Sequence, residues 1–96
     1  MLHLVNTSPF ESSDLESAAK YSAKDSPILL FEDGIYAAQA GTAMEGRVKE
    51  IMGDHPIYAL KADLEARGIS NIIDGITEVD YTGFVELVEQ HKTASW

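Results

Sequence analysis

The stretch Pro27-Ile28-Leu29-Leu30-Phe31-Glu32-Asp33-Gly34 decides the fold class of this chain. Four apolar residues follow the proline without polar alternation, as expected of a strand that is covered on both faces, and such strands belong to parallel sheets. Glu32-Asp33-Gly34 then ends the apolar run with residues that favour turns. The stretch therefore predicts a buried strand of a parallel sheet.

Similar strand patterns and several helical patterns alternate around this stretch. Further strands are predicted at residues 2–5, 57–60 and 76–79, and helices at residues 13–22, 35–39, 43–51, 62–67 and 80–92. Such alternation implies a mostly parallel sheet with helices on both faces, joined by right-handed crossovers. We expect one α/β domain spanning residues 1–96, a small Rossmann-like or flavodoxin-like three-layer sandwich.

Two helix starts carry sequence signals. Ser13-Asp14-Leu15-Glu16 matches a capping box, in which hydroxyl and carboxylate each bind an unpaired backbone amide. Asp80 is predicted to cap the last helix. In that helix Tyr81, Phe84, Val85 and Val88 are expected to form one apolar face, with Leu87 beside it.

Composition excludes several kinds of function. Sixteen acidic and seven basic residues give a formal charge of -9, which disfavours direct binding to a phosphate backbone. The chain has no cysteine, so disulfides, thiolate metal sites, persulfides and cysteine nucleophiles are excluded within it. Met1–Val5 lacks the basic region of a signal peptide, and no apolar run approaches the ~20 residues of a membrane helix. We expect a cytoplasmic protein that does not contact membranes.

Two loops at predicted strand ends are the first candidates for a site, because ligands of open α/β sheets gather there. The loop Asn6–Ser12 contains Ser8, Pro9 and Phe10, but it lacks the glycines of a phosphate-binding loop. The loop Glu32–Tyr36 offers two adjacent carboxylates that could act as acid and base. A turn at Asp33-Gly34 that also caps the following helix is the favoured interpretation, because no catalytic partner is identifiable.

Other constellations of reactive side chains are weak. His3, His55 and His91 show no metal-ligand spacing, so we expect no metal site: His3 is expected to be hydrogen-bonded and half-buried, and His55 to belong to a turn. The serines lack a Gly-x-Ser-x-Gly elbow. What remains is a set of aromatic and soft side chains that could serve an interface or the core: Phe10, Tyr36, Met44, Tyr58 and Trp96.

An ordered series of short motifs resembles the TusB/DsrH family along essentially the whole chain. The motifs are Met1-Leu2-His3, Ser8-Pro9-Phe10, Leu29-Leu30-Phe31-Glu32-Asp33-Gly34-Ile35-Tyr36-Ala37-Ala38, Tyr58-Ala59-Leu60, Asp63-Leu64-Glu65-Ala66-Arg67-Gly68, Asp80-Tyr81-Thr82-Gly83-Phe84-Val85 and the final Trp96. Some DsrH-type members carry a cysteine in the first helix, where this chain has Ala18 and Ala19. That difference favours the TusB-like branch and a supporting role without a catalytic group.

The resemblance implies a subunit that assembles with TusC/DsrF-like and TusD/DsrE-like chains and has no cofactor. In such complexes a cysteine of the TusD/DsrE-like subunit passes persulfide sulfur to a TusE/DsrC-like acceptor. The sulfur serves 2-thiolation of the wobble uridine of transfer RNA or, as the alternative, oxidation of stored sulfur. We expect the interface or loop residues to be Ser8, Pro9, Phe10, Glu32, Asp33, Gly34 and Tyr36.

Two hypotheses from other classes stay open. One is a homo-oligomeric module that binds a small ligand near Ser8, Glu32 and Asp33. The other is an enzyme that uses Glu32 or Asp33 as acid or base, which we rank last.

Overall fold

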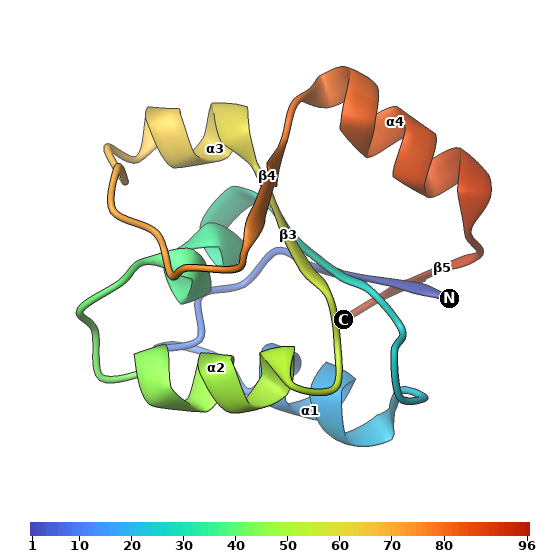
Figure 1. Cartoon of the computed structure of the whole chain (residues 1–96), viewed down its shortest axis with the longest axis horizontal. Coiled ribbons are helices and arrows are strands. Elements are labelled where there is room, and N and C mark those ends of the chain that lie inside the picture. Colours follow the sequence, from blue (N-terminus) through green and yellow to red (C-terminus); the bar gives the residue numbers. More distant parts are fainter.

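Five parallel strands form one sheet in the computed structural model, which describes residues 1–96 (Figure 1). The strands are β1 (Leu2–Val5), β2 (Ile28–Leu30), β3 (Ile57–Leu60), β4 (Thr77–Val79) and β5 (Thr93–Ser95). They are arranged in the order β4-β3-β2-β1-β5, and every neighbouring pair is parallel. The parallel α/β sheet predicted from the apolar runs is confirmed.

Helices connect the strands on both faces of this sheet. They are α1 (Asp14–Tyr21), the 3-10 helix η1 (Glu32–Ala38), α2 (Glu45–Met52), α3 (Lys61–Ala66) and α4 (Tyr81–Gln90). The chain steps from β1 to β4 in one direction and then returns across the whole sheet to β5. Because right-handed crossovers place the return connection on the opposite face, α4 lies across from α1 and α2 (Figure 1).

The main core fills the space between the sheet and the helices α1 and α2. It is a cluster of sixteen buried residues that includes Val5, Ile28 and Leu30 from the strands. Leu15 and Ala18 of α1 and Val48 and Ile51 of α2 reach it from the helices. The small side chain of Ala18 lets α1 pack close to the sheet.

The opposite face of the sheet has a thinner cover. Leu2, Leu29 and Leu60 are buried there, but α4 has no fully buried residue of its own. Half-buried Phe84, Leu87 and Val88 face the sheet, whereas 63% of Tyr81 and 49% of Val85 is exposed. The predicted apolar face was therefore wrong for Tyr81 and Val85, because only the arc around Phe84 and Val88 meets the sheet.

Of the two predicted helix caps, the structure confirms one and contradicts the other. Asp80 caps α4 as predicted, since its Oδ1 accepts a hydrogen bond of 2.8 Å from the amide of Gly83. The capping box at α1 was wrong, because Ser13 has φ -95° and ψ 15° instead of an extended backbone, and its hydroxyl caps nothing. The amide of Asp14 instead donates to Oγ of Ser12, 3.1 Å away.

The last strand was missed in the sequence. β5 pairs with β1 through Leu2 and Thr93, His3 and Ala94, and Leu4 and Ser95. Its residues are small and polar, so no apolar pattern marks it.

None of the helices is long and apolar enough to cross a membrane.

Candidate functional site

The two predicted loops leave adjacent parallel strands at the same end of the sheet. Val5 is the register partner of Leu30, and the amide of Phe31 donates to the carbonyl oxygen of Val5, 3.1 Å away. Gly34 packs directly against the end of β1: a Cβ at Gly34 would lie 2.2 Å from the carbonyl oxygen of Val5. Only glycine fits there, so residue 34 fixes how closely the second loop approaches the first.

The first loop folds around Ser8. The Oγ of this buried serine accepts a hydrogen bond of 3.2 Å from the amide of Phe10. Its carbonyl oxygen accepts two more, from Glu11 at 3.1 Å and Ser12 at 3.0 Å. The hydroxyl and the carbonyl of Ser8 are thus both used within the turn. Phe10, the tip of this loop, is 54% exposed.

The residues predicted as the second loop form the first turns of η1, and side chains of α3 and its C-cap residue hold this second loop in place. Glu32 has the left-handed backbone angle φ 48°, and its amide donates to Oδ2 of Asp63, 2.6 Å away. Oδ1 of Asp33 accepts from Nε of Arg67 at 3.0 Å and pairs with Nη2 at 2.9 Å. Because Asp33 is 57% exposed, this ion pair adds little stability, but it fixes the orientation of the loop.

Glu32 and Asp33, the two carboxylates that could act as acid and base, differ in their contacts. Asp33 is already engaged by Arg67, and Glu32 makes no ion pair. The molecule has three surface hollows, and none is lined by Ser8, Glu32 or Asp33. None of these hollows opens at the two carboxylates.

The aromatic and soft side chains divide between core and surface. Tyr36, Met44 and Trp96 are partly buried and pack against the core, and Tyr58 is half-buried. Phe10 is the member of this set that is largely exposed. Tyr81 and Val85 were missed as surface residues, because their helical spacing with Phe84 and Val88 favoured a place in the core.

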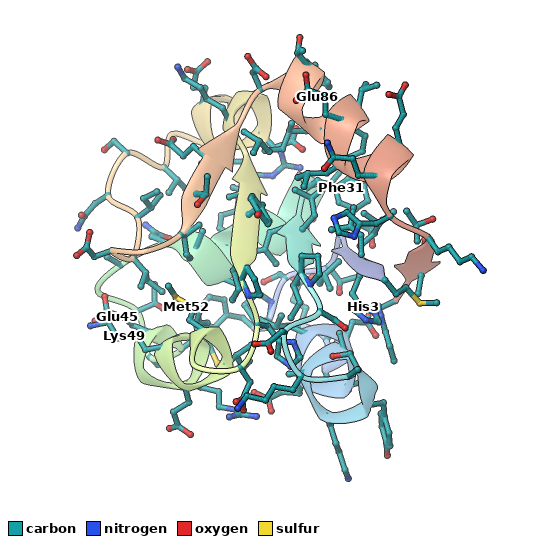
Figure 2. The ribbon with its side chains drawn as sticks, turned by 45° about the vertical axis from the view of Figure 1, so that its right-hand side comes forward. His3, Phe31, Glu45, Lys49, Met52 and Glu86 are labelled. Atoms are coloured by element: carbon teal, nitrogen blue, oxygen red, sulfur yellow. The ribbon has the colours of Figure 1, made fainter.

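Two of the three histidines are buried, each with its own partner. Nδ1 of His3 accepts a hydrogen bond of 3.0 Å from the indole nitrogen of Trp96 (Figure 2 labels His3). Burial lowers the pKa of His3, and repulsion from the amino terminus and His55 lowers it further. His55, with Nδ1 2.9 Å from the carbonyl oxygen of Ser26, joins the turn before β3 to that before β2. No three His, Cys, Asp or Glu side chains converge to hold a metal ion.

A five-stranded parallel sheet with helices on both faces defines a Rossmann-like α/β protein. Residues 7–94 match the DsrH-like protein family. Protein TusB of Serratia proteamaculans is 38% identical over 100 residues, and that of Enterobacter sp. is 39% identical over 100 residues, with all of both chains covered in each case. The chain belongs to the TusB/DsrH family of sulfur-relay proteins.

Solved structures share the fold at low sequence identity. The ychN protein of E. coli superposes with a TM-score of 0.78 and 17% identity, covering 99% of this chain and 97% of that one. A protein of unknown function from Methanobacterium thermoautotrophicum gives a TM-score of 0.69 and 15% identity, covering 99% and 96%. These similarities confirm the Rossmann-like architecture.

Proposed function

We propose that this chain is a non-catalytic structural subunit of a TusBCD/DsrEFH-like sulfur-relay complex, with residues 1–96 forming its single domain. The observation that carries the proposal is the absence of cysteine from a member of a sulfur-relay family. Sulfur is carried as a persulfide on a thiolate, so a chain without thiols can only support a partner that has one.

In this proposal the reactive cysteine lies on a TusD/DsrE-like chain, and a TusC/DsrF-like chain completes the cytoplasmic complex. The persulfide sulfur passes to a TusE/DsrC-like acceptor and ends in 2-thiouridine at the wobble position of transfer RNA. The name TusB of the full-length relatives supports this destination. Oxidation of stored sulfur is the alternative destination for the same role.

The two braced loops are the proposed contact with the cysteine-bearing partner. Ser8 and Pro9 shape the first loop so that Phe10 is exposed, and Gly34 holds the second loop against it. Asp63 and Arg67 fix Glu32 and Asp33 from α3, while Tyr36 anchors the loop in the core. A surface that is ordered before binding loses less conformational entropy when the partner docks.

Co-expression with the TusC/DsrF-like and TusD/DsrE-like chains of the same organism tests the proposal. We expect a stable heteromer by light scattering, and transfer of radiolabelled sulfur to the acceptor only when all three chains are present. Phe10→Ala should weaken assembly, whereas Tyr21→Ala, which removes another exposed aromatic ring on α1, should not. Covalent labelling of this chain by sulfur, or recovery of no heteromer, would contradict the proposal.

A further inference from the structure

A second surface, around the start of α4, has the features of a contact site. All three hollows of the molecule lie there, with volumes of about 280, 520 and 310 Å³. The first two share Lys61 and Asp80 between α3, β4 and α4, and the third lies against Val85. Tyr81 lines the first and the third, so the ring stands between two hollows.

The centre of this surface is apolar. Tyr81 and Val85 are one helical turn apart, and both are among the five large hydrophobic residues that the surface exposes. Their helix is the one α-helix that contributes no fully buried side chain, in contrast to α1, α2 and α3. Half-buried Phe84 still packs against Phe31, the residue that follows β2, with an edge contact of 6.3 Å between ring centroids. Figure 2 shows Phe31 below α4 and Glu86 on that helix.

The surroundings of this apolar centre are acidic. The hollows are lined by Glu65, Glu78, Asp80 and Glu86, with Lys61 as their single cation. None of these five charged side chains forms an ion pair within the chain, since all five salt bridges lie elsewhere. Asp80 already caps α4 through the amide of Gly83, and the other charges are available to a molecule that docks on α4.

We propose that Tyr81, Val85 and the surrounding carboxylates form a docking surface for a folded protein whose contact face is apolar and rimmed by Arg or Lys. Charge complementarity selects this occupant, because opposite charges steer association and like charges oppose it. A second copy of the chain would place Glu86 and its neighbours against carboxylates again. Nucleic acid and anionic lipid carry the wrong charge for the same reason.

The inference rests on the proposed function in one respect, namely that the chain has protein partners in a relay complex. It adds which surface one of them contacts and what side chains that partner brings. The first loop, which exposes Phe10, and this surface can then contact different subunits of a hetero-oligomer.

The test uses the co-expressed TusC/DsrF-like and TusD/DsrE-like chains as the binding probe, immobilised against this chain. The double variant Tyr81→Ala/Val85→Ala should bind at least about tenfold more weakly, as loss of a central contact does. Glu78→Gln/Glu86→Gln should weaken binding about threefold or more and flatten its dependence on salt. Tyr21→Ala is the matched control, because this ring is 70% exposed on α1 and should leave binding unchanged.

The outcomes separate the two proposals. If wild-type chain binds and the double variant binds within about twofold of it, the docking surface is refuted while the subunit role stands. If wild-type chain binds neither partner, both proposals fail. If the isolated chain is a dimer that Tyr81→Ala separates, the occupant is a second copy, and the basic partner is refuted. Circular dichroism of each variant checks that the helix content is retained.

Discussion

The indole nitrogen of Trp96 donates a hydrogen bond to Nδ1 of His3, 3.0 Å away, and joins the last residue of the chain to its first strand. The two rings lie 5.9 Å apart between centroids, and the amide of Trp96 also donates to the carbonyl oxygen of Leu4. Because Nδ1 must be unprotonated to accept this bond, the contact requires neutral imidazole.

Acidification should therefore loosen this contact. The pKa of His3 is lowered in the folded chain, mainly by burial, while in the unfolded chain it is about 6.5. The contribution of neutral His3 to stability is thus complete above the unfolded pKa and is lost as pH falls below it towards the folded pKa. Urea unfolding between pH 8 and pH 5, followed by fluorescence of the single tryptophan, should show this loss. An identical pH dependence in His3→Gln would contradict it.

Gly34→Ala should destabilise the chain strongly. Its new Cβ would meet the carbonyl oxygen of Val5 at 2.2 Å, and neither backbone segment can move without breaking the β1–β2 pairing. We expect a loss of about 3 kcal/mol in the free energy of unfolding, typical of severe overpacking. Gly46→Ala is the control, because nothing lies within 4 Å of its Cβ position in α2, and it should gain about 0.5–1 kcal/mol. Equal effects of both variants in urea denaturation would refute the close packing.

Asp80→Ala should loosen α4 selectively. Removal of this N-cap costs about 1 kcal/mol, and α4 has no buried side chain to offset the loss. Hydrogen exchange of the amides of residues 83–90 should accelerate more than exchange in α1. Ser13→Ala, at a position whose side chain makes no cap bond, should leave α1 unchanged. The Asp80 variant should therefore exchange faster in α4 relative to α1, and the Ser13 variant should exchange like the wild-type chain. An equal change in both variants would contradict the role of the Asp80 cap.

Asp63→Ala should free the second loop from α3. The variant loses the acceptor for the amide of Glu32 and one partner of Arg67, and we expect a cost of about 1–2 kcal/mol. Glu65→Ala, in the same helix, is the control, since Glu65 makes no ion pair. Unfolding free energies that fall equally in both variants would show that the contact between Asp63 and Glu32 is unimportant.

The sequence allowed the sheet to be predicted where burial leaves an apolar pattern. β2 and β3 are uninterrupted apolar runs, and the cap at Asp80 is a local contact over three residues. β5 left no such signal, because its stability comes from hydrogen bonds to β1 and not from apolar side chains.

The sequence predicted that the two strand-end loops lie together, but not the contacts that hold them. Consecutive parallel strands place their end loops together, which brought the loops after β1 and β2 to one place. The tie between Asp33 and Arg67 spans 34 positions in sequence and depends on where α3 lies. The exposure of Tyr81 likewise depends on which arc of α4 meets the sheet, which helical periodicity alone does not determine.

The outermost strands limit how this protein can associate. β4 and β5 are three residues long, and Thr77, Glu78, Thr93 and Ser95 are exposed on them. Short, polar outer strands discourage backbone pairing with another chain, which protects the sheet from uncontrolled extension into aggregates. Specific assembly must then depend on side chains of loops and helices, so the identity of a neighbour is determined by amino-acid chemistry instead of by generic main-chain hydrogen bonding.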